Sequence, residues 1–89
     1  MTRRLVTIIN KLGLHARAAA KLVALTSQFG SDIKLVKNTT EVNGKSILGV
    51  MMLAAAKGTE LELIADGADE TKALDALEEL IARRFDEAE

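Results

Sequence analysis

Apolar side chains recur along this chain with two different spacings, and each spacing predicts a different kind of element. Alternation at every second residue indicates a half-buried strand, and it is clearest at Leu61, Leu63 and Ala65. Recurrence at steps of three and four residues indicates a helix with one apolar side. On this basis strands are predicted over residues 4–9, 32–37, 40–42 and 60–66, and helices over residues 16–29, 47–57 and 69–85.

Local signals place the ends of the first two helices. Gly30 is expected to stop the first helix in a left-handed conformation, because glycine adopts that conformation without steric cost. Ser46 is expected to cap the start of the second helix through its side-chain oxygen. Lys57-Gly58 is expected to end that helix.

The predicted order is strand, helix, strand, strand, helix, strand, helix. This order is typical of an α+β domain in which helices gather on one face of a mainly antiparallel sheet. We therefore expect residues 1–89 to form a single domain with a four-stranded sheet, three helices on one face and water on the other.

Composition limits the possible classes of protein. Hydrophobic residues make up 48% and charged residues 28% of 89 residues, as expected for one folded domain with one core. The chain has no cysteine and one histidine, so we expect neither disulfides nor a transition-metal site, and a reducing cytoplasm is the expected location. Residues 1–9 lack the continuous apolar run of a signal peptide or a membrane span.

Nucleic acid is not an expected partner. Twelve basic and thirteen acidic residues give a net charge of −1, which leaves no basic surface to neutralise a phosphate backbone. The only aromatic residues are Phe29 and Phe85, so the chain has no platform on which bases could stack.

The single histidine, His15, lies where the first strand gives way to the first helix. The first backbone N–H groups of a helix have no carbonyl partner within the helix and favour a nearby anion. A phosphoryl group on His15 would therefore meet the amides of Ala16, Arg17 and Ala18. The Arg17 guanidinium follows closely enough to bind the same phosphoryl oxygens. The segment thus predicts a phosphohistidine site.

Two segments extend this prediction. Residues 12–19 read LGLHARAA, and residues 44–53 read GKSILGVMML after an Asn43-Gly44 turn. The first segment resembles the phosphohistidine motif of the HPr family, the phosphocarriers of the bacterial phosphoenolpyruvate phosphotransferase system. The second resembles the regulatory-serine segment of the same family, and the interval between the two also matches.

This resemblance implies a fold, a reaction and partners. The fold is an open-faced β sandwich of four strands and three helices. His15 would accept a phosphoryl group on Nδ1 from phosphorylated Enzyme I and pass it to an enzyme II-type acceptor, while Arg17 steadies the group. The chain would then be a carrier and not an enzyme, and no bound cofactor is expected. Ser46 would be a target of an HPr kinase/phosphorylase.

The chain departs from the family pattern at Ala18, where the family usually has proline. Alanine keeps a backbone donor that proline lacks and favours the helix, so we expect a mild effect. The acidic ending at residues 85–89 is similar to that of the nitrogen-related branch called NPr. Sugar uptake and nitrogen regulation therefore both stay open as the system that this chain serves.

Ser46 has two further interpretations. A serine at this position serves as a helix cap without any regulatory role. The Gly44-Lys45-Ser46 sequence also suggests a nucleotide-binding loop, but Thr39 occupies the position of the earlier glycine that such a loop requires. We therefore reject nucleotide binding and keep capping and regulation.

Apolar residues on the second predicted helix are too numerous for a short helix to bury. We expect some of them to form a docking patch around His15, with methionine suited to a surface that meets several partners. The expected members are Leu14, Ala20, Ile47, Leu48 and Met51. A regulatory docking or effector-binding module that is never phosphorylated remains the alternative, whereas a hydrolase would need an acid or a triad that the chain lacks.

Overall fold

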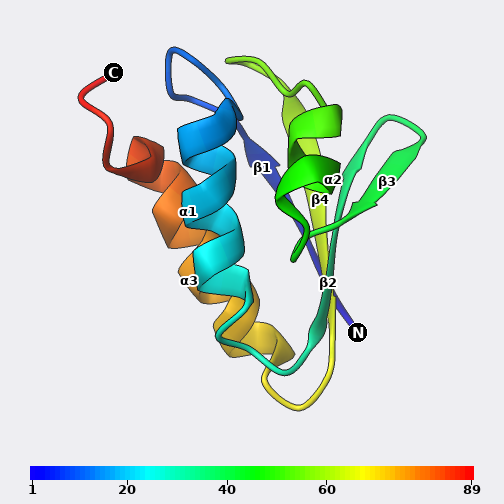
Figure 1. The fold of residues 1–89 in the computed structure, drawn as a ribbon. Coiled ribbons are helices and arrows are strands. Elements are labelled where there is room, and N and C mark those ends of the chain that lie inside the picture. The colour runs from blue at the N-terminus through cyan, green and yellow to red at the C-terminus, as the bar shows by residue number, and fades with distance from the viewer.

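The computed structural model describes all 89 residues and contains one sheet covered by helices on one side (Figure 1). Four antiparallel strands lie in the order β1-β4-β2-β3. Their bounds are β1 Thr2–Thr7, β2 Asp32–Lys37, β3 Thr40–Asn43 and β4 Glu60–Asp66. The helices are α1 Ala16–Thr26, α2 Ile47–Met52 and α3 Glu70–Ala82. The predicted α+β open-faced sandwich is confirmed.

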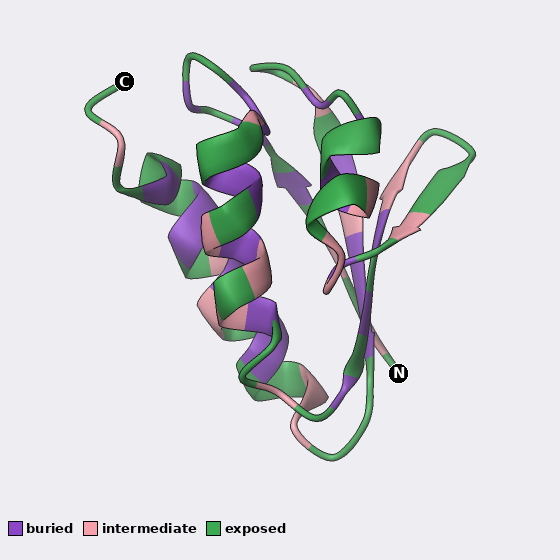
Figure 2. Ribbon diagram, in the orientation of Figure 1, coloured by how far each residue is buried: buried purple, intermediate pink, exposed green.

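The alternating apolar residues of β4 lie at the centre of the core. Leu61, Leu63 and Ala65 are all fully buried and lie opposite Val6 of β1 and Leu35 of β2, among others. Figure 2 shows the buried residues gathered between the sheet and the helices. The opposite face of the sheet is mainly polar and meets solvent, with Leu5 65% exposed there. None of the helices is long and apolar enough to cross a membrane.

The first helix ends earlier than predicted. α1 stops at Thr26, and Gly30 does not adopt the left-handed conformation expected of it. Contacts with distant segments determine this end. The Thr26 hydroxyl donates to the Gly44 carbonyl at 2.7 Å, and the Gly30 amide donates to the Asp69 carboxylate at 2.9 Å. These partners become available only in the folded chain, and they override the local glycine signal.

The second helix is also shorter than predicted, because it ends at Met52 and not at residue 57. The chain leaves the helix through Ala54, which has a φ of 50°. Lys37 of the neighbouring strand β2 donates from Nζ to the Leu53 carbonyl at 3.1 Å, which satisfies a free carbonyl at the helix end. The cap at Ser46 is as predicted, since its Oγ accepts from the Gly49 amide at 3.0 Å.

The first strand lies at residues 2–7 instead of the predicted 4–9. Its position follows from pairing with β4, where Thr2 lies opposite Ala65 and Thr7 opposite Glu60. The apolar residues at positions 8 and 9, which led to the longer prediction, follow the end of the regular strand. Ile8 is buried and still exchanges hydrogen bonds with the segment before β4, through Thr59 and Gly58.

The third helix was predicted to reach residue 85 but ends at Ala82. The chain then enters a short turn, η1 (Arg84–Asp86), in which all three residues have positive φ angles of 59°, 53° and 63°. Phe85 is fully buried even so. Phe85 fitted the predicted helical spacing because it is apolar and buried. Its side chain reaches the core from a left-handed turn and not from a helix.

Acid is expected to weaken a contact between β1 and α3. Hydrogen bonds from the Thr2 hydroxyl and from the Met1 amino group lower the pKa of Glu70 from 4.5 to about 2. A carboxyl group whose pKa is depressed by folding contributes stability above its unfolded pKa and loses that contribution as the pH falls through the folded value. In urea unfolding, the stability difference between wild type and Glu70→Gln should therefore be present at pH 7 and shrink between pH 4.5 and about 2. A difference independent of pH would contradict this assignment.

Candidate functional site

His15 lies at the N-cap of α1, in an extended conformation with φ −73° and ψ 177°. Its carbonyl accepts the first hydrogen bond of the helix from the Ala19 amide at 2.8 Å. The preceding loop is held in place at Gly13, which has a φ of 64°, and at Leu14, whose amide donates to the Ala55 carbonyl at 2.9 Å. A Cβ at Gly13 would lie 2.4 Å from that same carbonyl oxygen, so the approach to His15 requires glycine.

The amides of Ala16, Arg17 and Ala18 form the first turn of α1, where helical N–H groups lack carbonyl partners within the helix. The His15 side chain does not cap them. The helix also has its positive dipole end here. Ala18 is fully buried and keeps the backbone donor that a proline would remove.

The imidazole of His15 and the side chain of Arg17 line the same open depression of about 380 Å³. Arg17 is exposed, while the His15 side chain is 28% exposed. The structure therefore brings together the ring, the arginine and the first-turn amides that the sequence analysis had grouped. A phosphoryl group on the ring would lie close to both kinds of donor, the guanidinium and the amides.

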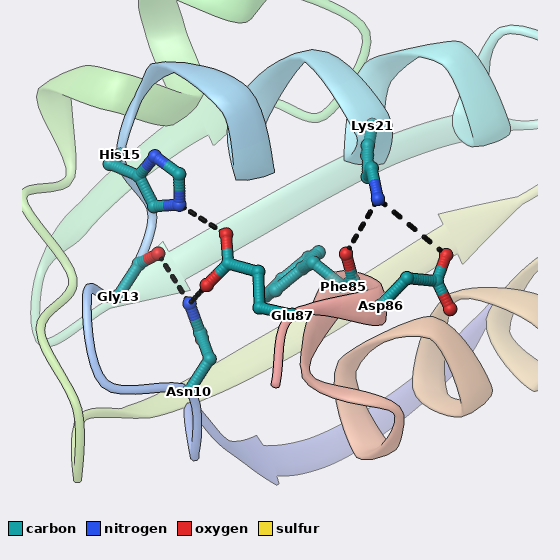
Figure 3. Close-up of polar contacts among 7 residues, drawn as sticks. All are labelled: Asn10, Gly13, His15, Lys21, Phe85, Asp86 and Glu87. Carbon is teal, nitrogen blue, oxygen red and sulfur yellow. Dashed lines mark hydrogen bonds and ion pairs between the residues drawn. The ribbon is translucent and has the colours of Figure 1, made fainter. Parts of the chain in front are cut away.

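The sequence analysis missed a carboxylate at this site. Glu87, which follows η1, lies against the ring, and its Oε2 interacts with Nε2 of His15 (Figure 3). Its Oε1 accepts from Nδ2 of Asn10 at 3.0 Å, and Asn10 also donates to the Gly13 carbonyl at 2.8 Å. The only signal in the sequence was an acidic ending, which does not reveal a contact across 72 positions.

Glu87 is charged where it lies. Burial raises the pKa of Glu87, but hydrogen bonds from Asn10 and His15 outweigh that effect and hold the pKa below its ordinary range. Asn10 is completely buried, and both of its contacts are made through Nδ2 while its Oδ1 has no partner. The two acceptors therefore determine how the Asn10 amide is oriented, and they connect Glu87 to the loop that precedes His15.

Exposed apolar side chains lie on α2, which packs beside α1, and at Leu12, which lines the same depression as His15. Val50 is the only residue of α2 that is buried, so the expectation that this helix leaves apolar residues in solvent is confirmed. We call the following set the apolar patch: Leu12, Ile47, Leu48, Met51 and Met52. Leu48 is 70% exposed, and α2 lies beside α1 in Figure 1.

Leu14 was expected in this patch, and that prediction is wrong. Leu14 is only 5% exposed and belongs to the hydrophobic core. The hydrogen bond between the Leu14 amide and Ala55 draws this residue inward, so that Leu12, 66% exposed, faces solvent beside His15 instead. Ala20 is exposed on α1 as expected.

Fold and site together define a class of protein, a small open-faced sandwich that presents a histidine at the positive end of a helix to receive an anionic group. Comparison with known proteins identifies the same class. The family described as "PTS HPr component phosphorylation site" matches residues 2–83. The chain belongs to the HPr family of phosphocarrier proteins of the phosphotransferase system.

Individual relatives match along the whole chain. Phosphocarrier proteins HPr of Neisseria meningitidis and Cupriavidus necator are each 56% identical to it over 89 residues, covering 100% of both chains. Among solved structures, HPr of Thermoanaerobacter tengcongensis superposes with a TM-score of 0.96 at 43% identity, again over 100% of both chains. The expected family, fold and carrier role are thereby confirmed.

Proposed function

We propose that His15 accepts a phosphoryl group on Nδ1 from phosphorylated Enzyme I and passes it to an enzyme II-type acceptor. One observation carries this assignment: His15 is the N-cap residue of α1, directly before the amides of Ala16, Arg17 and Ala18, which lack helical partners. The matching phosphorylation-site family supports it.

The reaction requires little from the protein beyond position and charge. The Nδ1 lone pair of His15 attacks phosphorus, and the bond from phosphorus to the donor's leaving atom breaks with its electron pair remaining on the donor. The first-turn amides and the Arg17 guanidinium donate hydrogen bonds to the phosphoryl oxygens, whose charge they partly neutralise. The next acceptor then removes the group by the same displacement at phosphorus, which restores free His15. The chain is therefore a carrier within a relay of enzymes.

The apolar patch is the surface that we assign to these partners. A donor and an acceptor must each bring a reactive atom within about 3 Å of His15, which requires docking beside the ring. Ile47, Leu48 and Met51 provide apolar contact there, and Ala20 extends it along α1. A relay of this kind operates where phosphoenolpyruvate is made, so we place the protein in the cytoplasm.

Ser46 is a candidate for regulation by an HPr kinase/phosphorylase. Ser46 is partly exposed at the start of α2 and directly precedes Ile47 and Leu48 of the apolar patch. A phosphate on Ser46 would place negative charge at the edge of that patch and weaken docking of partners that carry acidic groups. The helix N-terminus would tolerate the phosphate, so regulation would not require unfolding.

The direct test is intact mass after incubation with Enzyme I, Mg²⁺ and phosphoenolpyruvate. We expect one added phosphoryl group that is lost on acid treatment, since phosphohistidine is acid-labile and phosphoserine is not. His15→Ala should gain no group. Enzyme I of the sugar system and Enzyme I of the nitrogen system should both be tested, because the sequence does not distinguish which of the two systems this chain serves. Absence of modification with either would favour the regulatory docking module instead.

A further inference from the structure

The last six residues form a defined structure beside His15, and the transfer step proposed above assigns them no role. We call residues Arg84 to Glu89 the tail. It leaves α3 through three consecutive left-handed residues and then runs toward His15 (Figure 3). Left-handed backbone is unfavourable for residues other than glycine, so such a turn persists only where surrounding contacts hold it.

Contacts on several elements hold the tail. Phe85 anchors it by full burial of its ring in the core. Lys21 of α1 donates from Nζ to the Phe85 carbonyl at 2.9 Å and pairs with the Asp86 carboxylate at 3.7 Å. Beyond Glu87, the Glu89 carbonyl accepts from the Lys11 amide at 2.6 Å. The tail is thus fixed on both sides of the residue that contacts the histidine.

These contacts hold Glu87 against the ring of His15. The Glu87 side chain is only 16% exposed, and its two oxygens have separate partners, Nε2 of His15 and Nδ2 of Asn10. A carboxylate accepts hydrogen bonds and does not donate them. The neutral imidazole therefore carries its proton on Nε2 and leaves the lone pair on Nδ1, the nitrogen that Glu87 does not occupy.

The charge on Glu87 also matters during transfer. When Nδ1 of neutral His15 attacks phosphorus, the Nε2 proton stays in place, and the ring becomes formally cationic as the N–P bond forms. A carboxylate hydrogen-bonded to that N–H stabilises the cation, as the aspartate of a serine-protease triad does for its histidine. Phosphorylation at Nε2 would instead require displacing Glu87 and placing two anions side by side.

We propose that Glu87 is a positioning residue for phosphoryl transfer: it fixes the Nε2–H tautomer of His15, directs attack to Nδ1 and balances the charge that the ring acquires. This inference rests on the proposed function, since it assigns a role within the same transfer step. The tail is the structural device that makes it possible, because it places a carboxylate from the end of the chain on a ring at its beginning.

The test combines a measurement that needs no partner with one that does. ¹⁵N NMR of the imidazole nitrogens reports the tautomer in the unphosphorylated protein. We expect nearly pure Nε2–H in wild type and averaging with the Nδ1–H form in Glu87→Ala. In steady-state exchange with Enzyme I, Glu87→Ala should lower kcat by about 10- to 100-fold, the range for losing a hydrogen bond to a charged group, with KM little changed.

Two further variants sharpen the result. Glu87→Gln retains an acceptor oxygen but removes the charge, so it should keep more of the wild-type tautomer than Glu87→Ala while kcat still falls. Glu79→Gln is the matched control, because Glu79 is an exposed carboxylate that pairs only with Arg83, at 3.0 Å. It should match wild type in both measurements.

Identical nitrogen shifts and an unchanged kcat in Glu87→Ala would overturn the proposal while leaving the carrier function intact, since wild type would still be phosphorylated. A drop in kcat with unchanged nitrogen shifts would overturn the tautomer role. Failure of wild type itself to accept a phosphoryl group would overturn the proposed function, and with it any role of Glu87 in transfer.

Discussion

Phe85→Ala is expected to lower the free energy of unfolding by about 3 to 5 kcal/mol, the usual cost of removing a fully buried phenylalanine ring. Phe85 is the largest of the completely buried side chains and the apolar anchor of the left-handed turn. Because the domain is small and has one core, such a loss removes a large part of its stability. Urea unfolding followed by circular dichroism measures it.

The chain provides a close control in Arg84→Ala. Arg84 belongs to the same turn and has nearly the same backbone conformation, with a φ of 59°, but its side chain is exposed. We expect this variant to stay within about 0.5 kcal/mol of wild type. A loss below about 1 kcal/mol for Phe85→Ala would show that the ring is not packed as described.

Leu48→Asp is expected to slow phosphoryl exchange with Enzyme I by about a hundredfold while the domain stays folded, the effect of losing a central docking contact of nearly 3 kcal/mol. Leu48 is 70% exposed on α2, so little core packing is lost. A charge at its position has to be desolvated against an apolar partner surface, which is unfavourable. Exchange rates and thermal unfolding of the same preparation separate the two effects.

Leu5→Asp is the matched control for docking. Leu5 is exposed to a similar extent, 65%, but lies on the open face of the sheet, away from the helices. Its strand partner is Glu62, so the new carboxylate should cost a little stability by repulsion. Exchange should remain normal. Equal slowing in both variants, or none in Leu48→Asp, would contradict docking through the apolar patch.

The Ser46 and Glu87 proposals concern different parts of one surface. Ser46 borders the apolar patch on α2, whereas Glu87 lies on the tail beside the ring. A phosphate on Ser46 should therefore act mainly on partner binding, and loss of Glu87 mainly on the transfer step. The acidic ending suggested the nitrogen-related branch, but the role that we propose for Glu87 would be the same in either branch.

Local sequence patterns were sufficient to predict the order and type of the elements and the position of His15 at the start of the first helix. The alternation at Leu61 and Leu63 defined β4, and the helical spacing around Leu74 and Leu77 defined α3, because such periodicity depends only on which face a nearby side chain presents. The same holds for His15, since a strand-to-helix junction and its free amides are features of a few consecutive residues.

Tertiary structure alone decided the helix ends, the burial of Leu14 and the contact between Glu87 and His15. α1 ends where Thr26 meets the Gly44 carbonyl, and Leu14 turns inward because its amide binds Ala55. Glu87 reaches the ring through a left-handed turn that no local propensity favours. Each depends on a partner far along the chain, and such a partner becomes a neighbour only when burial of the shared core brings distant segments together.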